Sequence, residues 1–176
     1  MMMRMLQAGG VPILTDGLRA RDASNPHGYF EYDPVKRLHE DPDARWLTAA
    51  RGRAVKIVSS QLTWLPETNN YLVIFMRRDL DEVLRSQQRM LEESGTPDGS
   101  AGAQDLREAY SRHLEEVDRF VARRPAFTVL RVDYARVVAS PLDESRRVAA
   151  FLSRRLDLDR MAGAVDSTLY RNRAQA

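Results

Sequence analysis

The pattern of apolar and polar positions is clearest between Tyr71 and Leu91. Tyr71 to Met76 is a continuous apolar run, partly β-branched and aromatic, which predicts a strand buried on both faces, as in parallel sheets. Asp79 suits a helix N-cap, and Glu82 three residues later completes a capping-box pattern. Apolar residues then recur at helical spacing. The stretch therefore predicts a strand, a tight turn and a helix.

The rest of the chain alternates short strand patterns with helical ones. Further strands are predicted at residues 11–14, 54–58 and 127–132. Helices are predicted at residues 1–8, 33–38, 42–50, 105–123, 134–138, 142–153 and 158–164, with a helical turn at 59–65. This alternation predicts a single α/β domain over residues 1–176, in which helices flank a parallel sheet.

Composition narrows the class of protein. The 176 residues are 43% apolar and 30% charged, as expected for a globular domain with a substantial core. The net charge of +2 gives no bulk field that favours nucleic acid. The absence of cysteine excludes disulfides and cysteine-based metal sites, and the three histidines lack metal-ligand spacing, so no metal is predicted. No apolar run approaches the roughly 20 residues of a membrane span, so a cytoplasmic protein without membrane contact is expected.

Arg78 and Ser86 form the first candidate site. Ser86 lies seven residues, or about two helical turns, after the cap Asp79, so it should face the turn that carries Arg78. A guanidinium and a hydroxyl together suit a phosphate, and open α/β sheets bind ligands at the carboxyl ends of their strands. The alternative is that Arg77 and Arg78 are solvated and that Ser86 lies on a solvent-exposed face of the helix.

Three segments carry a family resemblance. An Arg that ends a buried strand and a helical Ser eight residues later, Arg78 to Ser86, resemble the 3′-phosphate-binding element of sulfotransferases that use 3′-phosphoadenosine 5′-phosphosulfate (PAPS). Residues 129–134 (VLRVDY), followed by Pro141 and residues 148–152, look like the family's next strand, turn and helix. The segment NPHGYFE at 25–31 is similar to an N-P-x-G-Y/F-x-E segment of bacterial members. The segments occur in family order.

The resemblance implies a fold, a donor and a reaction. It implies a sulfotransferase fold like that of P-loop NTPases, and transfer of a sulfuryl group from PAPS to an acceptor hydroxyl or amine. Arg78 and Ser86 would hold the 3′-phosphate. The acceptor is not specified, because acceptor pockets are built from variable loops. The partners expected are this small-molecule donor and acceptor.

One family feature is missing from the sequence. The family's first strand leads into a Gly-rich P-x-S-G-T-[ST] loop that holds the 5′-phosphosulfate with backbone N–H groups. No such loop occurs here, so the first strand and loop are expected to be absent from the fold. Either Met1 is an internal methionine, which we favour, or the product is truncated and inactive. Protein made from Met1 is expected to be poorly stable and inactive, because a lost central strand leaves buried backbone groups unpaired.

Glu31 is the candidate general base, by similarity to acidic bases in part of the family. It follows Tyr29 and Phe30, and burial beside these aromatic rings is expected to raise its pKa. The alternative is an exposed Glu just before a helix whose N-cap is Asp33.

Lys56 interrupts the apolar segment AVKIV and is the second catalytic candidate. In cytosolic sulfotransferases a Lys in a similar strand sits two residues before a catalytic His, but here Val58 occupies that position. Lys56 remains a candidate to neutralise charge on the leaving oxygen. The alternative is a structural lysine whose stem lies along apolar surface. Of the histidines, His27 is expected to be a turn residue and His113 to be solvated.

Other functional classes stay open. A non-catalytic module that binds a 3′-phosphonucleotide is the main alternative, because the 5′ loop is missing. A relative of P-loop NTPases is disfavoured, because there is no G-K-[ST] loop. An interaction protein that uses the helix at 105–123 is disfavoured, because the apolar face of that helix is explained by the core.

Overall fold

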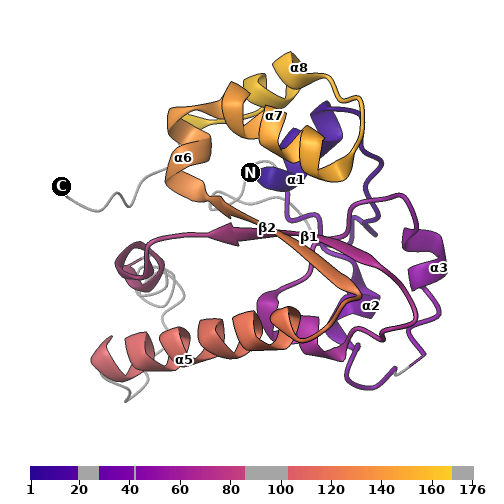
Figure 1. Cartoon of the computed structure of the whole chain (residues 1–176), viewed down its shortest axis with the longest axis vertical. Coiled ribbons are helices and arrows are strands. Elements are labelled where there is room, and N and C mark those ends of the chain that lie inside the picture. Colours follow the sequence, from indigo (N-terminus) through magenta and orange to yellow (C-terminus); the bar gives the residue numbers. More distant parts are fainter. Residues whose placement is uncertain (20–27, 42, 86–102, 168–176) are drawn as a thin grey trace.

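The computed structural model describes residues 1–19, 28–41, 43–85 and 103–167 (Figure 1). Its sheet consists of strand β1, Tyr71–Arg77, and strand β2, Phe127–Asp133. The strands are parallel and pair in register from Tyr71 opposite Phe127 to Arg77 opposite Asp133. The structure thus confirms both strands, and it confirms a parallel sheet flanked by helices.

Most helices also follow the sequence pattern closely, but the one predicted at residues 42–50 is helical only from Leu47. The helices are α1 Met2–Ala8, α2 Asp33–Lys36, α3 Leu47–Ala50, the 3-10 helix η1 Ser59–Trp64, α5 Ala103–Ala122, α6 Tyr134–Ala139, α7 Pro141–Leu152 and α8 Leu158–Gly163. A further helix starts at residue 80 and is described to residue 85. The rest of the helix predicted to follow β1 lies outside the described residues.

Two predicted strands form much less sheet than expected. Residues 11–14 and 54–58 meet only in an isolated parallel bridge between Ile13 and Ala54. The amide of Ala54 donates to the Pro12 carbonyl at 2.8 Å, and the Leu14 amide donates to the Ala54 carbonyl at 2.9 Å. Among the described residues no other strand lies beside these segments to extend the ladder, so each stays irregular.

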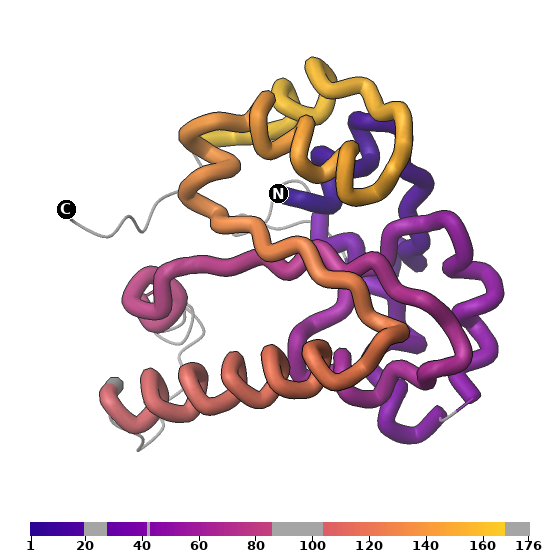
Figure 2. Tube along the Cα trace, viewed as in Figure 1, coloured from indigo at the N-terminus to yellow at the C-terminus, as the bar shows by residue number. Residues whose placement is uncertain are grey.

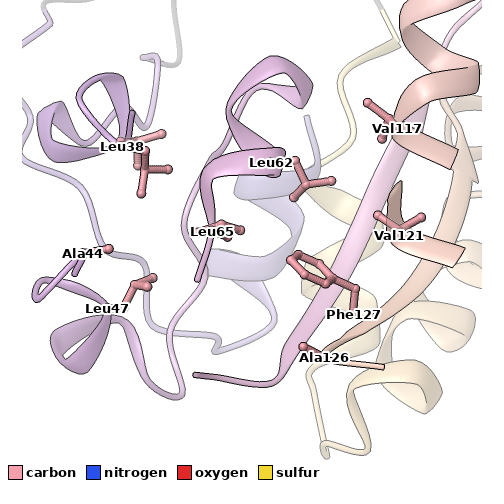
Figure 3. Close-up of a cluster of buried hydrophobic side chains, with 10 residues drawn as sticks. Leu38, Ala44, Leu47, Leu62, Leu65, Val117, Val121, Ala126 and Phe127 are labelled. Atoms are coloured by element: carbon pink, nitrogen blue, oxygen red, sulfur yellow. The ribbon is translucent and has the colours of Figure 1, made fainter. Parts of the chain in front are cut away.

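Helices cover both faces of the sheet (Figures 1 and 2). On one face, α1, α6, α7 and α8 enclose a core with the fully buried Met5, Val132, Val148 and Met161. On the other, α5, η1, α2 and α3 enclose a core around Leu38, Leu62, Val117 and Phe127 (Figure 3). Side chains alternate between the faces of a strand. The strand residues that enter the first core are therefore even-numbered (Ile74, Met76, Leu130 and Val132), and those that enter the second are odd-numbered (Tyr71, Val73, Phe75, Phe127 and Val129).

β1 is less buried than its sequence predicts. Each of its residues is at least partly exposed, and Leu72 is 53% exposed, whereas Val132 in β2 is completely buried. The prediction of a strand buried on both faces is therefore confirmed only in part, because both faces pack against a core but no residue of β1 is fully buried. The reason is that β1 pairs with β2 along one edge only, and within the described part of the chain no strand pairs with its second edge.

Candidate functional site

The second edge of β1 borders a cavity of about 1350 Å³. Residues 71–78 line one side, and residues 50–57, including the whole 54–57 segment, line another. The peptide groups of a parallel strand point alternately to its two edges. The Tyr71 amide donates to the Ala126 carbonyl beside β2. The backbone N–H and C=O groups of the alternate residues Leu72, Ile74 and Met76 therefore point toward the opposite edge.

Arg78 stands where β1 ends, and it also lines the cavity. Its Nε donates to Glu82 Oε2 at 3.0 Å, and its guanidinium carbon lies 5.0 Å from the centre of the Tyr134 ring. The Glu82 side chain is only 2% exposed. A buried carboxylate and an aromatic ring therefore fix the guanidinium at the carboxyl end of β1.

The turn after β1 explains how this contact forms. Asp79 Oδ1 accepts hydrogen bonds from the amides of Asp81, at 2.9 Å, and Glu82, at 3.3 Å, which confirms Asp79 as the N-cap. The cap starts the helix, and the first helical turn brings the Glu82 carboxylate back beside Arg78. Ser86, the predicted partner of Arg78 in a phosphate site, lies outside the described residues, so the pairing stays a prediction.

Glu31 and Lys56, far apart in the sequence, are brought together. The Glu31 carboxylate lies 2.8 Å from Arg19 Nη1, 3.2 Å from Lys36 Nζ and 4.0 Å from Lys56 Nζ. Its side chain is 19% exposed, so it is not the exposed residue of the alternative interpretation. Glu31 itself is not among the residues that line the cavity, whereas Lys56 is.

The pKa of Glu31 moves opposite to the prediction. Desolvation acts to raise it, but hydrogen bonds from Lys36 and Arg19, together with their charges, outweigh desolvation and lower the pKa from 4.5. The expected upward shift is therefore wrong, because the sequence does not show that three cations gather on this carboxylate. A lower pKa makes the carboxylate a weaker base.

The segment around Glu31 also corrects the role expected for Asp33. Asp33 is the first residue of α2, and the N-cap position belongs to Tyr32. The Asp33 amide instead donates to Asp16 Oδ2 at 2.5 Å, so a carboxylate from the preceding loop satisfies this helix terminus. The Thr15 hydroxyl donates to the Glu31 carbonyl at 2.8 Å and ties the same two segments together.

Lys56 points toward residues 28–31 and the cavity. Its Nζ donates to the Tyr29 carbonyl at 3.0 Å. Burial lowers the pKa of Lys56, the charge of Glu31 opposes this shift, and the charges of Arg19 and Lys36 lower the pKa further. The net effect is a lowered pKa. Lys56 is therefore a half-buried cation at the cavity rather than a surface lysine.

His113 was missed by the sequence pattern. Its Nε2 lies 2.8 Å from the hydroxyl of Ser59, at hydrogen-bond distance, and both residues are half-buried and line the cavity. The expectation of a solvated histidine is wrong. A usable signal was present, because His113 lies three residues after Tyr110 and one before Leu114, two large side chains at positions that continue the apolar face of this helix. Of the other histidines, His39 lies 3.2 Å from Glu40, and His27 lies outside the described residues.

Comparison with known families assigns the domain. The family model described as "Sulfotransferase family" matches residues 39–157. The chain belongs to the sulfotransferase family. The domain is therefore assigned, at this level, to sulfuryl transfer between a small-molecule donor and an acceptor. Lys56, Arg78, Ser86 and His113 of the sulfotransferase lie inside the matched range, and Glu31 lies outside it.

The other comparisons add no relatives. Searches of the curated proteins and of the solved structures found no match. Within the described ranges, the structure contains no helix long and apolar enough to cross a membrane.

Proposed function

We propose that this sulfotransferase binds PAPS with its 3′-phosphate at Arg78 and Ser86, and transfers the sulfuryl group to an acceptor hydroxyl or amine. The observation that carries the proposal is the position of Arg78, which lines the cavity at the carboxyl end of β1. Its guanidinium is oriented in advance by Glu82 and Tyr134. An oriented guanidinium binds a phosphate at lower entropic cost than a mobile one.

The transfer breaks the S–O bond to the bridging oxygen of the donor and forms an S–O bond to the acceptor. Negative charge develops on the bridging oxygen, and a fixed cation in a site shielded from water stabilises it. Lys56 is proposed for this role, since its ammonium lies at the same cavity as Arg78. Adenosine 3′,5′-bisphosphate is the leaving product.

Glu31 is also proposed as the general base, by the resemblance to acidic bases in part of the family. Its three cationic neighbours support a second role, since its carboxylate holds Lys56, Lys36 and the loop at Arg19 together. Lys56 reaches the Tyr29 carbonyl from the same position. The proposed role of Glu31 therefore includes holding the Lys56 side chain against residues 28–31.

The fold proposal concerns the second edge of β1. We propose that this edge is the position at which the family's first strand, the one that leads into the 5′-phosphosulfate loop and has no counterpart in this sequence, pairs in a sheet of the P-loop NTPase type. The support is that the peptide groups of Leu72, Ile74 and Met76 point toward a cavity bordered by apolar side chains. Unpaired backbone groups are costly once such an edge is buried.

Titration with nucleotides tests the donor site. Adenosine 3′,5′-bisphosphate is expected to raise the melting temperature, because a ligand at 100 times its Kd adds about 2.7 kcal/mol of stability. Adenosine 5′-monophosphate, which lacks the 3′-phosphate, should give a much smaller shift. Arg78→Lys keeps a charge beside Glu82 but loses the planar fork, and it should weaken bisphosphate binding about tenfold or more. Arg45→Ala, at an exposed residue away from the cavity, is the control.

Equal shifts with the two nucleotides, or an unchanged affinity in Arg78→Lys, would contradict the donor site. The alternative function, a non-catalytic module for 3′-phosphonucleotides, is favoured by the lack of a Gly-rich loop in the sequence. Bisphosphate binding without any turnover of PAPS would support that alternative.

A further inference from the structure

We propose that Ser59 and His113 form a proton relay that takes the proton from the acceptor hydroxyl. This inference rests on the proposed function, and it names the acceptor side of the same cavity. The juxtaposition that carries it is a serine–histidine pair, with Ser59 Oγ 2.8 Å from His113 Nε2, on the wall of the cavity that Lys56 and Arg78 also line.

Two separate elements build the pair. Ser59 is the first residue of η1 and lies three residues after Lys56, so the segment that carries the proposed leaving-group cation also carries the hydroxyl. His113 comes from α5, which packs against η1. Tyr110, one helical turn before His113, lines the cavity as well, so α5 presents a polar row to it. Both members of the pair are therefore held by packed helices.

The observed contact suits proton transfer. A neutral imidazole accepts at Nε2 when Nδ1 carries the proton, and the Ser59 hydroxyl then donates to Nε2 and keeps lone pairs on Oγ. An acceptor hydroxyl bound at the cavity donates to Ser59 Oγ. As its oxygen forms the new S–O bond, its proton moves to Ser59 and the proton of Ser59 moves to His113. The bond to the bridging oxygen breaks, and imidazolium is the only new charge on the protein.

The comparison with Glu31 favours this pair. Hydrogen bonds and charges from Lys36 and Arg19 lower the pKa of the Glu31 carboxylate, and Glu31 does not line the cavity. His113 lines the cavity, and an imidazole is the side chain most often used as a general base. Within the cavity wall, His113 is thus the better placed base.

A chromogenic hydroxyl compound tests the relay without a donor. The probe is 4-nitrophenol, whose phenolate absorbs visible light, at neutral pH, where free imidazole is largely unprotonated and can accept a proton. The wild-type chain is expected to increase the phenolate absorbance on binding, because the relay removes the proton and the Lys56 ammonium stabilises the anion. His113→Gln retains a polar group that can hydrogen-bond Ser59 but takes up no proton. His113→Gln should therefore reduce the rise in phenolate absorbance about tenfold or more. A tenfold change corresponds to one pKa unit.

Controls separate the relay from a purely structural contact. Ser59→Ala should also reduce the increase, and His39→Gln, at an exposed histidine outside the cavity, should leave it unchanged. Circular dichroism checks that each variant is folded. The relay is overturned if wild-type protein produces no phenolate, or if His113→Gln produces as much as wild type. These results are independent of the nucleotide titration, so loss of the donor site and loss of the relay are distinguishable.

Discussion

At the scale of single residues, the two buried carboxylates in the described part of the chain, Glu82 and Glu144, each lie beside arginines. Glu82 is 2% exposed and receives Arg78. Glu144 is 1% exposed and receives Arg147 at 2.5 Å and Arg136 at 3.3 Å. Burying an unpaired carboxylate is costly, so each of these arginines has a structural task. At Arg78 this task coincides with a position at the cavity, so the residue proposed to bind the donor phosphate also pairs with a buried carboxylate.

Gly9 tests how tightly α1 packs on α8. A Cβ at Gly9 would lie 2.5 Å from Met161 Cγ, and Met161 is fully buried. Gly9→Ala is therefore expected to lower the free energy of unfolding by about 1–3 kcal/mol through overpacking. Gly163→Ala is the matched control, because a Cβ there meets nothing within 4 Å. Urea unfolding measures both, and equal stabilities of the two variants would contradict the packing.

The contacts of Glu31 predict a pH dependence. Its pKa is lower in the folded chain than its ordinary 4.5, so it contributes stability above that pH, and the contribution is lost as the pH falls through the folded pKa. Glu31→Gln should therefore destabilise the chain at neutral pH and have little effect in acid. Urea midpoints at both pH values measure this. Glu40→Gln, at a side chain 62% exposed, should show no such difference, and a gap for Glu31→Gln that widens in acid would contradict the expectation.

At the scale of elements, the helices are attached to the sheet by specific polar contacts as well as by apolar packing. Arg147 on α7 reaches both Glu144 and the backbone carbonyl of Arg131 in β2, at 3.4 Å. Asp157 caps α8 by accepting from the Arg160 amide, and its own amide donates to the Gly9 carbonyl. These contacts fix α7 against β2 and α8 against the end of α1.

Arg147→Ala tests the attachment of α7. It leaves the Glu144 carboxylate buried without its closest cation, so it should cost about 2–4 kcal/mol of stability. Arg146→Ala removes the neighbouring arginine, whose partner Asp143 is 69% exposed, and should cost less than about 1 kcal/mol. Thermal or urea unfolding compares the two variants. A similar loss for both would show that burial of Glu144 contributes nothing.

The single pairing of β1 predicts an alternation in hydrogen exchange. The amides of Val73 and Phe75 point toward β2, and those of Ile74 and Met76 point toward the cavity. The first two should exchange slowly, and the second two faster, because exchange requires that a backbone hydrogen bond be absent or open. Hydrogen exchange followed residue by residue by NMR measures the four rates. Four equally slow amides would show that another strand already pairs with this edge.

At the scale of the whole molecule, a two-stranded sheet separates two cores. Such a narrow sheet cannot shield its residues alone, so the chain on either side of it, arranged as Figure 2 shows, packs a core against each face. The cavity lies along the edge where no described strand continues the sheet. Its walls come from β1, the 54–57 segment and α5, which explains why residues distant in sequence meet there.

Leu38 tests the core on the α5 side. Its side chain is 1% exposed and packs with residues from α3, η1 and α5. Leu38→Ala should reduce the free energy of unfolding by about 2–5 kcal/mol, since it removes buried methyl groups and leaves a void. Leu18→Ala is the control, because Leu18 is 76% exposed and should cost less than about 0.5 kcal/mol. Urea denaturation measures both, and a small loss at Leu38 would contradict this core.

The sequence by itself determined the elements and the family resemblance. The run at 71–76, the cap at Asp79 and the helical spacing after Tyr134 are local signals, and the structure confirms them because neighbouring residues alone set them. The family assignment agrees, since the motif at Arg78 to Ser86 lies inside the matched range. Arg78 and Lys56 were also predicted to be site residues, and both line the cavity.

Only the tertiary structure decided which side chains meet. It placed Lys36 and Arg19 on the Glu31 carboxylate, and so reversed the predicted direction of its pKa shift. It left β1 half exposed by pairing it on one edge, and it brought His113 to Ser59 across 54 residues. The physical reason is that pKa, burial and proton transfer depend on distances across the fold, whereas sequence periodicity reports only the geometry of adjacent residues.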